Sequence, residues 1–158
     1  MAHQKPTKQF LEDYAIGQLY RSGRLRVDKA QIFAFATQFD PQPHHLDEEA
    51  ASKSVFRGLA ASGWHTAALT MRLIVESEFR PADGVLGVGF DDLSWLRPVR
   101  PGDELRAECE VLEVQPSKVR TDHGLVRVRA KTFNQDGKPV QIFTARILVP
   151  CRPAHVPK

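Results

Sequence analysis

The sequence has no long hydrophobic run and only two cysteines. No apolar stretch approaches the roughly 20 residues that a membrane helix needs, and the polar first eight residues lack the apolar centre of a signal peptide. Cys109 and Cys151 lie far apart and form no C-x-x-C motif, which argues against a disulfide framework and a cysteine metal site. We therefore expect a cytoplasmic protein with no membrane association and with Cys109 as a small core side chain.

The sequence also has little excess of one charge sign over the other. Lys and Arg total 22, Asp and Glu total 19, and the formal net charge is only +3. No dense Lys/Arg block is interleaved with aromatic residues, so the sequence does not predict nucleic-acid binding. With 42% hydrophobic and 26% charged residues in 158, it is typical of one ordinary globular domain. We expect a disordered lead-in over 1–9, the domain over 10–150 and an irregular tail over 151–158.

Helical patterns occupy the first half of the chain. A strand over 17–27 precedes a helix that starts at Asp28, a candidate N-cap with Gln31 at capping-box spacing, and ends at Asp40. A short helix is expected over 47–51. The longest pattern runs over 63–79 behind Ser62 as its N-cap. Its apolar positions, at spacings of three and four, are Trp64, Ala67, Ala68, Met71, Ile74 and Val75.

The second half reads as strands. Four alternating or β-branched segments cover 85–96, 104–115, 124–135 and 139–149, with turn residues between them. Helices segregated from a run of antiparallel strands define an α+β fold. A curved antiparallel sheet wrapped around the one long helix is the simplest way to bury that helix, which is the hot-dog architecture.

The stretch 39–47 carries the strongest candidate for chemistry. Asp40 and His45 stand five residues apart on a segment that Pro41 and Pro43 stiffen. Proton transfer requires such fixed geometry, and the pKa of histidine lies near neutrality. A plain surface turn with the same residues is the alternative, and at this point both stay open.

Asp40-x-Gln42-Pro43-x-His45 resembles the hydratase-2 signature of MaoC-type enoyl-CoA hydratases. The Ala61-Ser62-Gly63-Trp64 step and the segment 98–105 also resemble that family, and the likeness spans about residues 13–149. It implies that Asp40 and His45 activate a water that adds to an enoyl thioester. Which of the two is the base stays open.

The resemblance implies further roles. The Gly63 N–H, at a helix N-terminus, would stabilise the developing enolate oxygen as an oxyanion donor. Gln42 and Pro43 would orient the turn, although the family usually has Asn at the Gln42 position and Gly at the Phe39 position. Four residues are candidates for the substrate pocket: Phe39, His44, Ser62 and Trp64.

Other residues carry weaker expectations. Arg97 and Arg100 are candidates for contacts with CoA phosphates. A metal site at His44 and His45 is not expected, because neighbouring side chains on one turn project apart. Trp64, Phe90 and Trp95 could line an acyl pocket but are more typical of core packing. His65 is expected to be packed or at an interface, and Glu76 and Glu78 to be solvated.

The resemblance thus implies a lyase that hydrates a 2-enoyl-CoA to a 3-hydroxyacyl-CoA, with no cofactor beyond the CoA thioester substrate. The alternatives are a hot-dog acyl-CoA thioesterase and a non-catalytic acyl-CoA-binding module. A homodimer is implied, with hexamers built from dimers also occurring in the family. The acyl chain, and the choice between CoA and a carrier protein, stay open.

Overall fold

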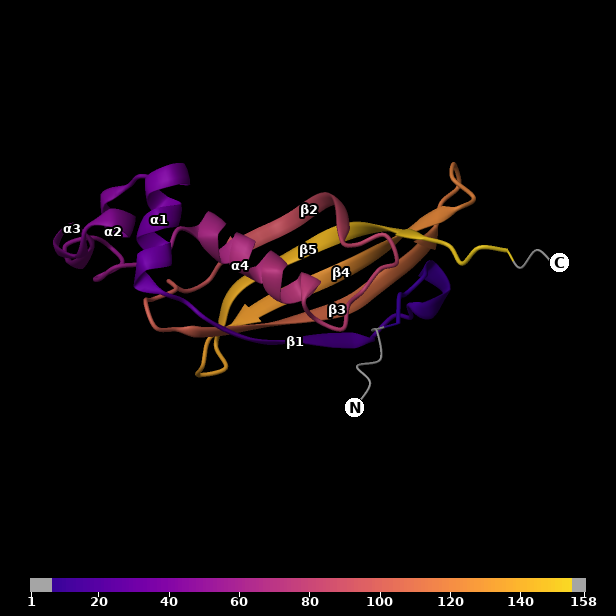
Figure 1. The fold of residues 1–158 in the computed structure, drawn as a ribbon, viewed down its shortest axis with the longest axis horizontal. Helices are drawn as coiled ribbons and strands as arrows, with labels where there is room; N and C mark the ends of the chain where they lie inside the picture. The colour runs from indigo at the N-terminus through magenta and orange to yellow at the C-terminus, as the bar shows by residue number, and fades with distance from the viewer. Residues whose placement is uncertain (1–6, 155–158) are drawn as a thin grey trace.

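The protein, seen in a computed structural model that describes residues 7–154, consists of one antiparallel sheet and one long helix that lies across it (Figure 1). The sheet order is β1-β3-β4-β5-β2. The strands are β1 (Leu19–Arg26), β2 (Leu86–Trp95), β3 (Glu104–Pro116), β4 (His123–Phe133) and β5 (Pro139–Pro150). This confirms the predicted order along the chain, with one strand before the helices and four after them, and the α+β class.

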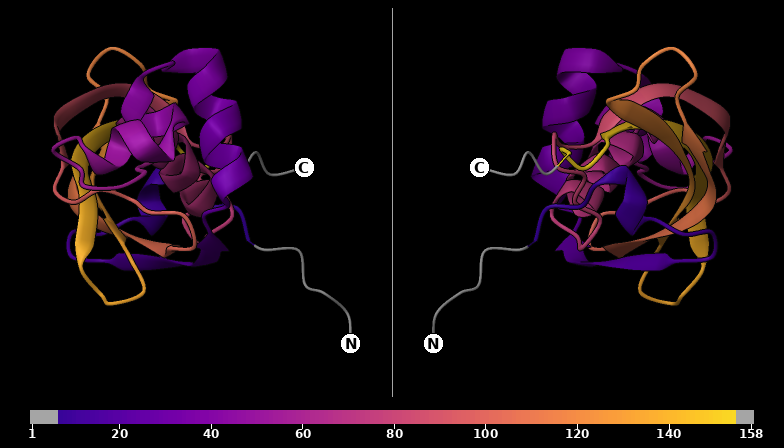
Figure 2. Two further views of the ribbon diagram at one scale, coloured as in Figure 1. Left: turned by 90° about the vertical axis from the view of Figure 1, so that its left-hand side faces the viewer. Right: turned by 90° about the vertical axis from the view of Figure 1, so that its right-hand side faces the viewer.

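The helices fall into two groups. A 3-10 turn, η1 (Leu11–Asp13), precedes β1, and the helices are α1 (Lys29–Phe39), α2 (Pro43–Leu46), α3 (Glu48–Ser52) and α4 (Gly63–Val75). Helices α1, α2 and α3 gather at one end of the molecule, whereas α4 runs along the sheet (Figure 1). In the end views the sheet curves around α4 (Figure 2), which is the predicted hot-dog arrangement.

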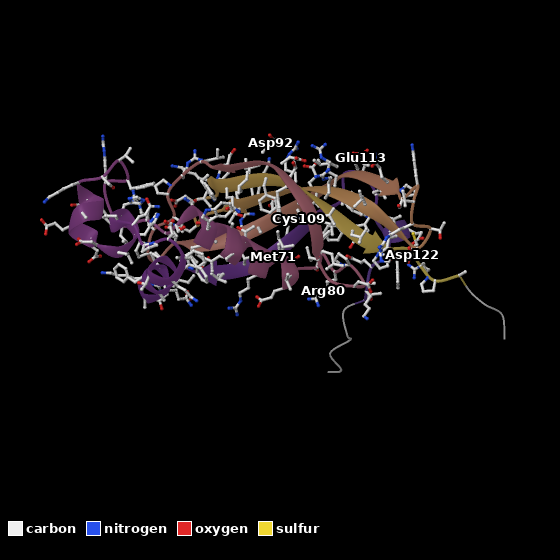
Figure 3. All side chains as sticks on the ribbon, turned by 90° about the horizontal axis from the view of Figure 1, so that it is seen from above. Met71, Arg80, Asp92, Cys109, Glu113 and Asp122 are labelled. Carbon is white, nitrogen blue, oxygen red and sulfur yellow. The ribbon has the colours of Figure 1, made fainter. Side chains whose placement is uncertain are left out.

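The core lies between α4 and the inner face of the sheet. Strands β3 and β4 alternate buried with half-buried positions, and their register pairs Cys109 with Ala130 and Val111 with Val128. All four of these side chains are buried. Cys109 is thus a core residue, as predicted, and burial raises the pKa of its thiol to about 12. Figure 3 shows Cys109 inside the molecule, with Asp92 and Arg80 on opposite outer sides.

Side-chain caps define three helix starts. Asp28 accepts a hydrogen bond from Ala30 N at 3.0 Å, and Asp47 accepts one from Ala50 N at 3.0 Å. Ser62 caps α4 by accepting one from Trp64 N at 3.2 Å. The N-caps predicted at Asp28 and Ser62 are confirmed.

Two predictions about the helices were wrong. The long helix ends at Val75 rather than at 79, because Ser77 Oγ donates to Ile74 O at 2.6 Å and accepts from Phe79 N at 3.1 Å. That turn directs Phe79, only 1% exposed, into the core. The second difference is α2, which was expected to be a plain turn: Pro43 occupies its first position, where a missing N–H costs nothing.

The predicted apolar face of α4 is only partly the buried one. Its buried residues are His65, Thr66, Thr70, Leu73 and Ile74. Trp64 is 59% exposed and Val75 is 53% exposed. Several positions of the predicted stripe therefore face away from the sheet of this chain.

Residues close to both limits of the described range contact the rest of the fold. Residues 1–6 of the predicted lead-in lie outside the described part, but Gln9 N donates to Arg80 O at 2.9 Å, so the prediction of disorder is wrong at Gln9. In the tail, Arg152 pairs with Asp13 at 2.6 Å, and 151–154 form no helix or strand, as predicted. Between residues 7 and 154, no helix has the length and apolarity required to cross a membrane.

Candidate active site

The turn between α1 and α2 places an acid beside a histidine. Asp40 ends α1, its N–H donating to Ala36 O at 2.9 Å, and Gln42 Nε2 donates back to Asp40 Oδ1 at 2.5 Å. Pro43 then begins α2, which turns His45 inward so that it is only 4% exposed. The two prolines and the Gln42 amide thus hold the acid and the histidine in one fixed arrangement.

The tautomer of His45 follows from its partners. Its Nδ1 lies 2.6 Å from Ala60 O, and because a carbonyl oxygen only accepts, Nδ1 carries the proton. Nε2 is therefore the atom that faces Asp40, 3.3 Å from Oδ2. One water molecule can contact both of these atoms. The arrangement brings together the two predicted catalytic residues in geometry suited to proton transfer.

Ser62 supports the carboxylate from the start of α4. Its Oγ donates to Asp40 Oδ2 at 2.6 Å while it accepts from Trp64 N. Desolvation pushes the pKa of Asp40 upward, but the hydrogen bonds from Ser62 and Gln42 and the nearby His45 outweigh it and lower that pKa. Asp40 is thus an ionised acceptor at neutral pH.

Gly63 stands at the N-terminus of α4, beside the acid–histidine pair. As the first helical residue its N–H has no partner within the helix, and the positive end of the helix dipole lies there. A Cβ on Gly63 would come within 2.5–2.8 Å of three ring atoms of Trp95. Glycine is therefore required by the close approach of an indole, in addition to the substrate access that the sequence suggested.

A cleft of about 370 Å³ opens at this point. Asp40, His45 and Gly63 line it together with Trp64, Trp95 and Val99. A wider hollow of about 680 Å³, next to Arg26 and Gly102, contains no paired acid and histidine. The cleft at the start of α4 is the candidate active site.

Trp95 had two expectations from the sequence, a place in an acyl pocket and the favoured one, core packing. It was expected in the core, yet it is 43% exposed and lines the cleft, with its ring 5.2 Å from that of Trp64 and at 83° to it. Core packing was also the wrong expectation for Phe90, which is 52% exposed, whereas Trp64, 59% exposed, had been a pocket candidate as well. Ala60, whose carbonyl holds His45, had no sequence signal, because any residue supplies a carbonyl.

Three of the four pocket candidates, Phe39, His44 and Ser62, do not line the cleft. Phe39 is 64% exposed and packs on Phe35, and His44 packs edge-on to His45 at 4.2 Å and against Phe56 at 5.1 Å. Burial, with a smaller contribution from His45, lowers the pKa of His44. Trp64 does line the cleft, whereas Ser62 lies behind Asp40 and acts through it.

Arg100 is engaged by the backbone. Its guanidinium donates to Gly58 O at 2.8 Å, to Leu59 O at 3.1 Å and to Phe56 O. We name this arrangement the Arg100 clamp. The clamp leaves Arg100 a poor candidate for CoA phosphates. Arg97 donates to Pro139 O at 2.7 Å but also lines the cleft, so its phosphate contact stays a prediction.

His65 is packed, as predicted. It is 5% exposed, its ring stacks on Phe35 at 4.7 Å and 7°, and its Nδ1 has no partner within residues 7–154. Glu76 is exposed and pairs with Arg72 at 3.1 Å. In the same part of the chain, no three His, Cys, Asp or Glu side chains are grouped so as to hold a metal ion.

A curved sheet around one helix, with an acid–histidine turn set against the helix start, defines the hot-dog hydratases and dehydratases as a class. Residues 13–134 match the family described as MaoC like domain. The chain belongs to this MaoC-like family.

Individual relatives agree with this assignment. The chain is 39% identical over 139 residues to the uncharacterised protein YdeM of Bacillus subtilis, covering 88% of this chain and 96% of YdeM. It is 55% identical to the MaoC-like dehydratase from Rhodospirillum rubrum, with a TM-score of 0.88 and coverage of 92% and 99% of the two chains. The (R)-hydratase PhaJ1 from Pseudomonas aeruginosa is 28% identical, with a TM-score of 0.70 and 94% of each chain covered.

Proposed function

We propose that this protein adds water reversibly to the 2,3-double bond of a 2-enoyl-CoA, giving a 3-hydroxyacyl-CoA. The observation that carries the proposal is the placement of His45 Nε2 and Asp40 Oδ2, 3.3 Å apart, in the cleft that also contains Gly63 at the start of α4. The likeness to a protein described as an (R)-hydratase supports the same reaction class.

The reaction needs one proton removed from water and one delivered to carbon. The acid–histidine pair takes a proton as the water oxygen bonds to C3, and the electrons of the double bond move to the thioester oxygen. In this proposal the Gly63 N–H, at the positive end of the α4 dipole, stabilises that enolate. The enolate then re-forms the thioester carbonyl as C2 takes the proton from the pair, so that H and OH have been added.

Loss of absorbance by the conjugated thioester of crotonyl-CoA tests the proposal. Asp40→Asn and His45→Ala should each lower kcat by a factor on the order of 10²–10⁴, the range for general acid–base groups. Unchanged rates in both variants would refute the assignment of the pair. Release of free thiol would instead identify a thioesterase, and binding without turnover a non-catalytic acyl-CoA module.

We also propose a homodimer. The exposed apolar side chains of α4 lie near the two ends of β2: Trp64 is edge-on to Trp95, and Val75 lines a hollow together with Val85. Strand β2 is an edge strand that exposes Leu86, Val88 and Phe90. An exposed edge with apolar side chains is a template for pairing with another strand. A second copy that pairs along β2 would extend the sheet and cover the apolar side chains. Cys109 and Cys151 are free thiols, in keeping with the cytoplasmic location that we propose.

A further inference from the structure

A chain of buried polar side chains runs between α4 and the sheet. Thr70 lies on α4, Thr132 on β4 and Gln141 on β5, and each is 0% exposed. Polar groups are costly to bury unless they are hydrogen-bonded, so the core of this domain carries these three for a reason that apolar packing would not supply.

Each hydrogen bond among these buried polar side chains has a defined direction. Trp95 Nε1 can only donate, so the atom of Gln141 that it meets at 2.8 Å is the acceptor Oε1. Gln141 Nε2 then donates to Thr70 Oγ1 at 3.1 Å. The Thr70 hydroxyl donates to Thr66 O at 2.8 Å, which leaves the Thr132 hydroxyl to donate to Thr70 Oγ1 at 2.7 Å.

Trp95 connects this buried hydrogen-bond network to the candidate active site. It is the last residue of the edge strand β2, and its indole lies against Gly63 and edge-on to Trp64. Because the ring is 43% exposed, packing alone restrains it only on one side. The bond from Nε1 to Gln141 supplies a fixed anchor on the buried side.

We propose that Gln141 is a positioning residue, which holds the Trp95 indole beside Gly63 so that the ring closes one side of the cleft to long acyl chains. The volume of about 370 Å³ lies near the low end of the roughly 300–1,000 Å³ range of ligand sites, which fits a short substrate. The inference rests on the proposed hydration of 2-enoyl thioesters and names the substrate class: short-chain 2-enoyl thioesters.

Three variants separate positioning from general stability. Gln141→Leu keeps the side-chain size and removes the acceptor, while Thr70 retains Thr66 O and Thr132 as partners. Trp95→Phe removes the donor and keeps an aromatic ring. Thr132→Val is the control, because it deletes a buried hydroxyl of the same network but leaves the bond between Trp95 and Gln141 intact.

The substrate readout is the ratio of kcat/KM for four-carbon and eight-carbon enoyl-CoA substrates. The wild type should prefer the four-carbon substrate, and Gln141→Leu should reduce that preference by about tenfold, the scale of one well-fitted methylene. Thr132→Val should leave it unchanged. In the Trp95→Phe background, Gln141→Leu should have no further effect on the ratio, since both changes remove the same bond. Additive effects, or an unchanged ratio in Gln141→Leu, would overturn the proposal.

A second readout does not depend on turnover. The chain contains two tryptophans, so the ¹⁵N–¹H spectrum should show two indole signals, and the one missing from Trp95→Phe belongs to Trp95. In Gln141→Leu this signal should shift and exchange faster with solvent, while that of Trp64 stays in place. An unmoved Trp95 signal would show that Gln141 does not hold the ring. If the wild type hydrates no enoyl-CoA, the proposed function and the chain-length inference fail together, while the spectrum still decides the anchor.

Discussion

The Asp40 carboxylate is fixed in position and in charge state by its neighbours. Its Oδ1 accepts from Gln42, and its Oδ2 accepts from Ser62 and faces His45 Nε2. Both hydrogen-bond donors favour the charged form, which is why the pKa falls even though desolvation opposes the charge. Of the two donors, Ser62 is also the N-cap of α4, so one hydroxyl joins the acid to the helix that carries Gly63.

Ser62→Ala should therefore change catalysis and stability together. Removal of the hydroxyl raises the pKa of Asp40, so Asp40 becomes protonated at a higher pH and the acid limb of the pH–rate profile moves upward. Loss of the N-cap should also cost about 1 kcal/mol of unfolding free energy. Asp28→Ala is the matched control, because it deletes the N-cap of α1 without contacting Asp40. An acid limb identical in Ser62→Ala and wild type would contradict this role.

His65 should make the fold sensitive to mild acid. Desolvation lowers the pKa of its ring, so below about 6.5, the ordinary histidine value, the unfolded chain takes up a proton before the folded chain does. Stability is then lost as pH falls from about 6.5 toward the folded-state pKa, and each unit between the two values costs about 1.4 kcal/mol.

The measurement is chemical denaturation of wild type and His65→Leu at several pH values between neutrality and mild acid. The wild type should lose unfolding free energy more steeply than His65→Leu. A residual slope should remain in the variant, because the pKa of His44 is also lowered. Parallel pH dependences in the two proteins would contradict the prediction, and NMR titration of the His65 ring checks the direction of its shift directly.

At the scale of the elements, features set by neighbouring residues could be predicted from the sequence, and features set by distant residues could not. The caps at Asp28 and Ser62 depend on a side chain and an N–H two residues away, and both were predicted. Strand alternation likewise reports on the two faces of a sheet within one segment. The end of α4 was missed, because burial of Phe79 against Tyr14 and Tyr20, which lie far away in the sequence, decides it.

The candidate active site shows the same contrast between local and distant determinants. The family resemblance of two short motifs implied roles for Asp40 and His45, which lie on one turn, and for Gly63, which lies at a capped helix start. The tautomer of His45 depends on a backbone carbonyl, and the orientation of Trp95 depends on Gln141 from another strand. Such partners leave no pattern along the chain, since only the closed sheet brings them together.

The Arg100 clamp fixes the backbone next to the Ala60 carbonyl, which holds His45. It holds the backbone from Phe56 to Leu59, next to Ala60, whose oxygen accepts from His45 Nδ1. Arg100→Lys should lower kcat on the order of tenfold, the lower range for residues that orient a functional histidine, because an ammonium cannot reproduce the planar fork of a guanidinium.

Two thioesters distinguish this role from phosphate binding. A clamp acts on kcat, so Arg100→Lys should impair crotonyl-CoA and the phosphate-free N-acetylcysteamine thioester equally. If Arg97 contacts CoA phosphates, Arg97→Met should raise KM for the CoA substrate alone. If Arg100→Lys changed only the KM for crotonyl-CoA, Arg100 would instead be assigned to phosphate binding, and the proposed effect of the clamp on kcat would be wrong.

At the scale of the whole molecule, the exposed apolar side chains are unevenly distributed. The outer positions of α4 and the edge strand β2 carry Trp64, Val75, Val88 and Phe90, each more than half exposed. The opposite edge strand, β1, is different: Arg21 and Arg24 there are paired with Glu108 and Glu104. Charged edge strands resist pairing with other chains, and apolar ones favour it. The asymmetry selects β2 as the edge along which a second copy is proposed to pair.

Val88→Glu should therefore convert a dimer into a monomer. A second copy paired along β2 would bring two such carboxylates into one apolar interface, where unpaired charges are strongly unfavourable. Val119→Glu is the matched control, since Val119 is 93% exposed outside the strands and lies away from β2. Sedimentation velocity over a range of concentrations should give a dimer for the wild type and Val119→Glu, and a smaller species for Val88→Glu. Because Trp64 and Trp95 border the cleft on the same side as β2, Val88→Glu should also lose hydratase activity as it dissociates. A wild-type protein that sediments as a stable monomer would contradict the pairing and leave the edge of β2 as a surface of this chain alone.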